Sequence, residues 1–164
     1  CIRDRDTDVE VLKSFTPLLD SRCVLGMEEK EYIATSFMAF EKEHSLVKQF
    51  LNLYKNLTFL DENGQIITGT NVAKLTNLLI EKGFVQENYY QELEEGIKIY
   101  PKEFFSPYDY INCHYNITEN SYCVHHFAVS WMSKKEQVKK GIKKQLSKIL
   151  GPKKMNKIRE KIKG

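Results

Sequence analysis

Asp6 and Asp8, separated by Thr7, are the residues of this chain whose types and spacing best suit chemistry. The apolar-alternating run that follows, residues 9–12, predicts a short strand beginning at the second carboxylate. Two carboxylates at the mouth of a strand form a hard-oxygen site for a divalent cation, which completes its shell with water and substrate phosphates. On its own the pair is a weak signal, because two neighbouring acids are common on solvated turns.

His125 and His126 are the second set of residues that could contribute to such a site. They lie in an apolar segment, residues 122–127, that predicts a strand. Adjacent side chains of a strand point to opposite faces, so at most one of the two rings can face a metal. We favour His125, since imidazole is a reasonable ligand for Mn²⁺ beside carboxylates. The alternative is one packed ring and one exposed ring with no role in a site.

Short strands and helices must position these residues. We expect further strands at residues 23–27 and 97–100 and an amphipathic helix within residues 44–54. A loop with a helix N-cap at residues 68–71 should lead into a second helix that runs through Val72, Leu75, Leu78 and Leu79 and stops at Gly83. No internal repeat is present. This mixture favours an α/β or α+β domain.

The succession of motifs resembles the glycosyltransferases of family 32, which carry a DXD-type sugar-binding region and include bacterial capsular polysaccharide glycosyltransferases. The resemblance covers residues 6–131. It rests on the following segments: Asp-Thr-Asp-Val-Glu-Val-Leu-Lys (6–13), Thr-Gly opening a helix (68–69), Ile-Tyr-Pro-Lys-Glu-Phe-Phe (99–105), Tyr-Cys-Val-His-His (122–126) and Ser-Trp (130–131).

The resemblance implies an α/β fold of the GT-A type, with a Rossmann-like nucleotide-binding half leading into the DXD strand. It implies transfer of a sugar, in the manner of a hexosyltransferase, from a nucleoside diphosphate sugar to a glycan or lipid-linked acceptor in polysaccharide synthesis, with Mn²⁺ or Mg²⁺ as cofactor. Asp6 and Asp8 match the acidic pair, with Asp8 the expected direct ligand. His125 matches the histidine that completes the metal shell.

The resemblance also implies contacts to the donor diphosphate. Ser130 and Trp131 match a Ser-Trp whose hydroxyl and indole N–H can donate to phosphate oxygens, although this Trp would equally fill a core. Thr68 and Gly69 match a loop at a helix N-terminus, where polar or anionic groups bind. A purely structural role, in a turn and a helix cap, would explain these two residues equally well. This chain has Thr70 where the family has proline. No residue can be named as base or nucleophile, so retaining and inverting mechanisms both stay open.

The residues before the acidic pair depart from the family. A Gly-Gly-Ile-Tyr-Leu-type strand is usual there, whereas this chain has Cys1-Ile2-Arg3-Asp4-Arg5, and charged residues are poor occupants of a central buried strand. We therefore expect a truncated GT-A-like domain over residues 1–131 that lacks the upstream nucleotide-binding strands. The expected donor affinity of such a fragment alone is weak or nil.

Charge divides the chain into two parts. Residues 132–164 hold thirteen Lys and Arg against two Glu, a charge of +11, while residues 1–131 hold 12 basic and 20 acidic groups, a charge of −8. This basic tail predicts two amphipathic helices separated by Gly151-Pro152, and they could attach to an anionic membrane surface. We expect no nucleic-acid binding, because the tail lacks interleaved aromatic residues and the body is acidic.

Cysteine usage and hydropathy bear on the compartment. The four cysteines form no Cys-x-x-Cys pair, which is typical of thiols in a reducing compartment. No run reaches the ~18–20 apolar residues of a membrane span. We expect a cytoplasmic protein, peripheral at the inner membrane face if the tail attaches there. The alternative function is a non-catalytic remnant or a membrane-surface binding module built around the basic tail.

Overall fold

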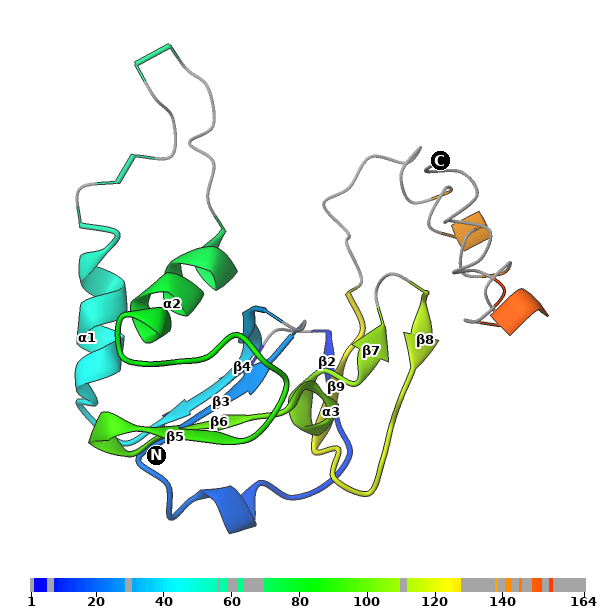
Figure 1. Ribbon diagram of the computed structural model, residues 1–164, viewed down its shortest axis with the longest axis horizontal. Helices are drawn as coiled ribbons and strands as arrows, with labels where there is room; N and C mark the ends of the chain where they lie inside the picture. The colour runs from blue at the N-terminus through cyan, green and yellow to red at the C-terminus, as the bar shows by residue number, and fades with distance from the viewer. Residues whose placement is uncertain are drawn as a thin grey trace.

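A mixed five-stranded sheet lies at the centre of the fold (Figure 1). The computed structural model describes residues 8–28, 31–55, 57–58, 62–63, 70–109 and 112–127, positions 138, 141–142, 145, 149–151 and 154, and the backbone of residues 2–5. In the sheet, the strands follow one another in space as β1 (Ile2–Arg5), β4 (Ile33–Phe40), β3 (Cys23–Met27), β6 (Ile97–Tyr100) and β5 (Gln91–Leu93).

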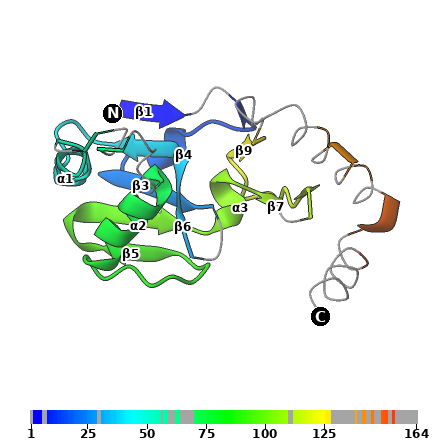
Figure 2. The same ribbon diagram turned by 90° about the horizontal axis from the view of Figure 1, so that it is seen from above.

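One pair in this sheet is parallel, β3 with β6, and the other three pairs are antiparallel. β1 lies at one edge and pairs only with β4, with Ile2 opposite Phe40 (Figure 2). The charged segment 2–5 thus forms an edge strand, and charged side chains are well tolerated at an edge. In this chain the segment does not occupy the central, buried position that its charges make unfavourable.

The two central strands differ in how clearly the sequence predicts them. β3 is a continuous apolar run, all five of its residues are buried, and it lies where we expect it. β4 is the longest strand, yet the sequence reading did not predict it. Its sequence, Ile-Ala-Thr-Ser-Phe-Met-Ala-Phe, contains two alanines and a serine, which have low strand propensity, and both of its faces are buried in part. Pairing with β1 and β3, rather than local preference, keeps this segment extended.

Two helices, α1 (Ser45–Asn52) and α2 (Asn71–Ile80), cover one face of the sheet (Figures 1 and 2). Both begin at side-chain caps: the His44 ring accepts from the Leu46 N–H at 3.2 Å, and Thr70 Oγ1 accepts from the Ala73 N–H at 3.1 Å. Both predicted helices are confirmed. The apolar core beneath them consists of Cys23, Leu25, Met27, Ile33, Phe40, Leu46, Leu75, Leu79, Phe84, Ile97 and Ile99.

A second core lies on the opposite face, under the one-turn helix α3 (Lys102–Phe105) and the 3₁₀ turn η1 (Thr16–Leu18). Its members are Val9, Phe15, Leu18, Val24, Phe37, Ala39, Phe105 and Cys123. Gly26 allows α3 to approach β3, because a Cβ at that position would lie 2.5 Å from Cδ2 of Phe105. The Phe105 ring in turn stacks on Phe37, with centroids 4.4 Å apart.

Beside the main sheet, two small antiparallel ribbons extend the fold. One joins β2 (Val9–Val11) to β9 (Cys123–His125), and the other joins β7 (Tyr108–Asp109) to β8 (His114–Tyr115). A single 3₁₀ turn, η2 (Glu94–Gly96), links β5 to β6. The strands expected near residues 8–12, 97–100 and 122–127 are therefore present. The mixed sheet with helices gives the chain a general α/β fold.

The described positions of the basic tail are helical, and Val138, Ile142 and Ile149 are largely exposed. Among the helices that the structure describes, none has the length and apolarity needed to cross a bilayer. The three described cysteines, Cys23, Cys113 and Cys123, are buried thiols.

Candidate functional site

Asp8 and His125 lie side by side where β2 and β9 meet. The two strands pair antiparallel with Val9 opposite His125, so Asp8, which directly precedes β2, reaches the last residue of β9. His125 Nε2 lies 3.2 Å from Asp8 Oδ1, and the two side chains are only 12% and 26% exposed. The backbone holds this corner, because the His126 N–H donates to the Asp8 carbonyl at 3.1 Å. Two residues far apart in the sequence thus form one largely buried carboxylate–imidazole pair.

The carboxylate oxygen and the imidazole nitrogen of this pair are suitable ligand atoms for a divalent cation. Two neighbouring ligands of an octahedral ion with bonds of ~2.1 Å lie about 3 Å apart, close to the separation of Asp8 Oδ1 and His125 Nε2. A carboxylate oxygen and an imidazole nitrogen also match the ligand preference of Mn²⁺. Within the described ranges, no group of three or more His, Cys, Asp or Glu side chains gathers around a possible ion. Further ligands would have to come from Asp6, from substrate or from water.

A second carboxylate–histidine pair lies next to the first, at the residue that follows β9. His126 Nε2 is 2.9 Å from Glu10 Oε2, and His126 Nδ1 is 2.9 Å from the Tyr115 hydroxyl. A carboxylate only accepts hydrogen bonds, so Nε2–H donates to Glu10 and, in the neutral ring, Nδ1 accepts from the tyrosine O–H. This network joins β2, β9 and β8. His125 and His126 therefore have different partners, Asp8 for the first ring and Glu10 with Tyr115 for the second.

Glu10 and Tyr115 were not predicted from the sequence, although the spacing of the acidic residues could have indicated Glu10. Acidic residues alternate with Thr and Val from Asp6 to Glu10, so a strand that uses one acid at a metal site can use another in a neighbouring contact. The tyrosine could not be found this way, because β8 is a two-residue strand with no periodic pattern. Burial, with smaller contributions from the Glu10 and Cys113 charges, raises the pKa of the Tyr115 hydroxyl, so it stays protonated and can donate to His126.

Aromatic rings enclose the end of β9. The Phe127 ring lies against the His125 ring with centroids 3.9 Å apart, and it also stacks on the Tyr108 ring with centroids 5.7 Å apart. Tyr108 contacts Tyr115 in turn, at 4.7 Å. Phe127 has a φ of +50°, a left-handed conformation that costs a non-glycine residue of order 1–2 kcal/mol. Its ring contacts are what stabilise this reversal, which places Phe127 over the His125 imidazole.

The remaining predicted site residues lie outside the described part of the chain. These are Asp6, Thr68, Gly69, Ser130 and Trp131. Their neighbours are described in part: Thr70 caps α2 as its position suggests, and the Asn71 side chain donates to Thr35 Oγ1 at 3.0 Å.

Comparison with known proteins adds no relative to this picture. No protein-family model, no curated protein and no solved structure matches this chain.

Proposed function

We propose that this chain carries the metal- and acceptor-binding region of a glycosyltransferase similar to family 32. Such an enzyme moves a sugar from a nucleoside diphosphate sugar to a glycan or lipid-linked acceptor in polysaccharide synthesis. The observation that carries the proposal is the 3.2 Å contact between Asp8 and His125, which are 117 positions apart in the sequence. The resemblance implies that these two residues share one metal shell, and direct proximity is what that role requires.

The roles of the residues follow from their chemistry. Asp8 offers a carboxylate oxygen and His125 an imidazole nitrogen to Mn²⁺ or Mg²⁺. When bound, such an ion neutralises the charge that develops on the diphosphate leaving group. Burial of the pair strengthens its electrostatic interactions, because surrounding water is reduced. Asp6 is the proposed second carboxylate ligand, and Ser130, Trp131, Thr68 and Gly69 are the proposed contacts to the donor phosphates. The general α/β fold supports, at a coarse level, the GT-A arrangement proposed here.

Titration of the isotope-labelled chain with Mn²⁺ tests the metal site directly. Because Mn²⁺ is paramagnetic, its binding at Asp8 and His125 should broaden the NMR signals of residues 8–10 and 123–127 at low metal concentration. Asp8→Asn and His125→Gln should each lower the Mn²⁺ affinity by at least tenfold. Calorimetry with nucleoside diphosphates, with and without Mn²⁺, then shows whether the bound metal recruits the donor phosphate.

Glu119→Gln serves as the matched control, since it removes an exposed carboxylate on the loop before β9 and should leave Mn²⁺ binding unchanged. Unselective broadening over the whole acidic surface would contradict the metal site. So would Asp8→Asn protein that binds Mn²⁺ as tightly as the wild type.

One observation favours a second candidate function, attachment to an anionic membrane surface. Val138, Ile142 and Ile149 are helical and 61%, 58% and 78% exposed, in a segment of charge +11. Spacings of four and seven residues place these apolar side chains on one side of a helix. An exposed apolar stripe among lysines is the arrangement by which helices lie on lipid surfaces. This attachment is compatible with a lipid-linked acceptor and does not require catalysis.

A further inference from the structure

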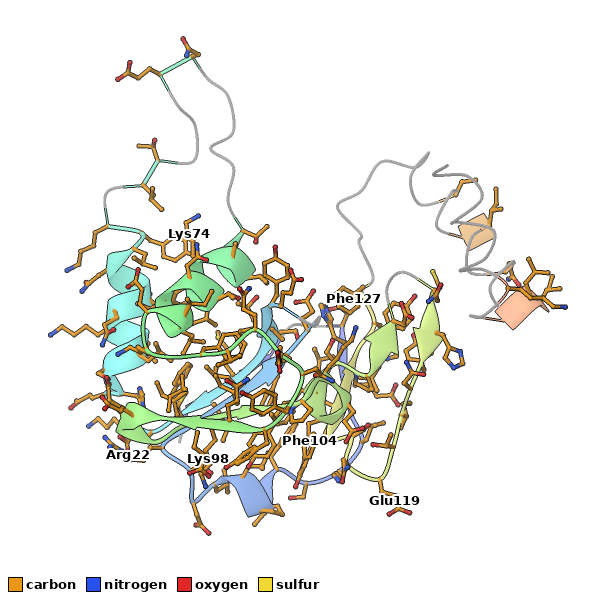
Figure 3. The ribbon with its side chains drawn as sticks, viewed as in Figure 1. Arg22, Lys74, Lys98, Phe104, Glu119 and Phe127 are labelled. Carbon is orange, nitrogen blue, oxygen red and sulfur yellow. The ribbon has the colours of Figure 1, made fainter. Side chains whose placement is uncertain are left out.

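Part of the sheet face opposite α1 and α2 is open to solvent. In β6, Ile97 and Ile99 point into the core beneath the helices, so Lys98 and Tyr100 point to the other face. Over β3 and β4 that face is covered by α3 and η1, whereas along β5 and β6 its side chains are half-buried or exposed. Lys98 and Phe104 both lie on this side of the molecule in Figure 3.

Aromatic and charged side chains alternate on this open face. The antiparallel register places Glu92 opposite Lys98, and it extends to place Tyr90 beside Tyr100. The two tyrosine rings meet edge to face with centroids 5.1 Å apart, and the Tyr90 hydroxyl donates to the Glu92 carboxylate. The strand pair therefore presents two rings next to one cation and one anion.

The row of rings continues beyond the sheet toward the candidate site. The ring centroids of Tyr100 and Phe104 of α3 are 5.0 Å apart. Those of Phe104 and Tyr122 are 6.3 Å apart, and the planes of these two rings differ by 19°. Lys13 Nζ lies 4.2 Å from the centre of the Tyr122 ring. Phe105, the next residue of α3, is fully buried. Tyr90 is exposed, whereas Tyr100, Phe104 and Tyr122 are half-buried and pack at the rim of the second core. We call these four rings the aromatic row.

The chemistry of the aromatic row selects one class of ligand. The face of an aromatic ring is electronegative and attracts the apolar C–H face of a sugar ring. Beside the rings, Glu92 and Glu103 can accept hydrogen bonds from sugar hydroxyls, while Lys98 and Lys102 can donate to them. Lys13, Lys98 and Lys102 against Glu92 and Glu103 leave this face within one charge of neutrality, which favours an uncharged ligand over a nucleic acid or an anionic lipid.

The position of the row connects it to the Asp8–His125 pair. Tyr122 directly precedes β9, and His125 ends it three residues later, a distance of about 10 Å along an extended strand. A short run of linked sugar rings can span that length. We propose that the aromatic row binds a neutral oligosaccharide whose end extends toward Asp8 and His125. Its identity as the acceptor rests on the function proposed above, while sugar binding itself does not.

Titration of the whole chain with neutral hexasaccharides of mannose, glucose, galactose and N-acetylglucosamine tests the proposal. At least one should bind with a millimolar or tighter Kd and shift the NMR signals of residues 90–104 and 122. Tyr90→Ser and Phe104→Leu should each weaken that binding at least fivefold. Tyr90 is exposed, so its replacement leaves the core intact, and Leu at 104 keeps the packing of α3 apolar.

Tyr54→Ser is the matched control. Tyr54 is 39% exposed and Tyr90 is 42% exposed, but Tyr54 follows α1 on the opposite side of the sheet, so its replacement should leave sugar affinity unchanged. Absence of binding by all four hexasaccharides would overturn the proposal, as would unchanged affinity in both row variants. Self-association that Tyr90→Ser abolishes would also overturn it, because the row would then be an interface between two copies.

The hexasaccharide titration and the Mn²⁺ titration test the two proposals separately, so one proposal can be wrong while the other holds. If hexasaccharides bind in the absence of metal and Mn²⁺ does not bind at Asp8, the aromatic row stands as a sugar-binding surface and the transferase proposal fails. If Mn²⁺ binds selectively and no hexasaccharide does, the metal site stands and the aromatic row has no sugar-binding role.

Discussion

At the scale of single residues, the end of β9 depends on two neighbouring histidines with different partners. His125 contacts Asp8, while His126 lies between Glu10 and Tyr115. The two His126 contacts reach Glu10 of β2 and Tyr115 of β8, so they anchor the residue that directly follows His125. Groups that hydrogen-bond to a metal ligand typically change metal affinity by 10- to 100-fold when they are replaced, and we expect the anchoring of the neighbouring residue to have an effect at the lower end of that range.

Replacement of His126 by Gln should therefore lower the Mn²⁺ affinity about tenfold. Tyr115→Phe removes one of the two contacts, so it should lower the affinity less and cost about 1 kcal/mol of stability. Both effects can be measured by Mn²⁺ titration and by urea denaturation of the same samples. Tyr89→Phe, at an exposed tyrosine near β5, is the control. A loss of stability with unchanged Mn²⁺ affinity would mean that the network is structural only.

At the scale of elements, the close approach of α3 to β3 determines where the second core and the aromatic row lie. α3 spans only Lys102–Phe105, and such a short helix has little stability of its own. Phe105 fixes it by packing over Gly26 and against Phe37, and Phe104 then lies half-buried at the rim of the second core. Gly26 is therefore a packing residue, selected for the absence of a side chain.

Gly26→Ala should destabilise the protein by about 1–3 kcal/mol, because the new methyl group overlaps the Phe105 ring and a well-packed core relaxes only partly. Thermal denaturation should show a lower Tm. Gly141→Ala is the control: a Cβ there meets no atom within 4 Å, and alanine favours the helix, so stability should be unchanged or slightly higher. Wild-type stability of Gly26→Ala would show that α3 can shift without cost.

At the scale of the whole molecule, charge is distributed unevenly. An acidic body of charge −8 contains the Asp8–His125 pair, and a tail of charge +11 follows it. The two parts should respond differently to salt, since exposed charges are screened within about 8–10 Å at physiological ionic strength, whereas largely buried pairs are screened much less.

Binding to lipid vesicles tests the role assigned to the tail. The chain should co-sediment with vesicles that contain phosphatidylserine, bind pure phosphatidylcholine vesicles weakly, and dissociate as NaCl rises. Ile142→Asn should weaken binding by removing apolar area from the stripe. Val85→Asn, at an exposed valine of the body, should not. Equal binding to neutral and anionic vesicles would contradict electrostatic attachment.

Much of the local structure could be predicted from the sequence. A continuous apolar run predicted β3, the Ile-Lys-Ile-Tyr segment predicted β6, periodic spacing predicted α1 and α2, and the acids before Val9 marked the start of β2. β4 was not predicted, although its Ile, Thr and Phe residues favour a strand, because burial on both faces removes the apolar–polar alternation and two alanines and a serine interrupt the pattern. α3 was not predicted either, since one turn of helix is too short to show the 3.6-residue spacing of apolar side chains.

The sequence by itself determined which residues could form the site: a carboxylate pair, a histidine pair, and the order in which they follow one another. Only the tertiary structure decided which members meet. The antiparallel pairing of β2 with β9 brings Asp8 to His125 and Glu10 to His126, and no local preference encodes a contact between residues more than a hundred positions apart. The aromatic row depends on the same cause, because its rings come from β5, β6, α3 and the start of β9, and only packing aligns them.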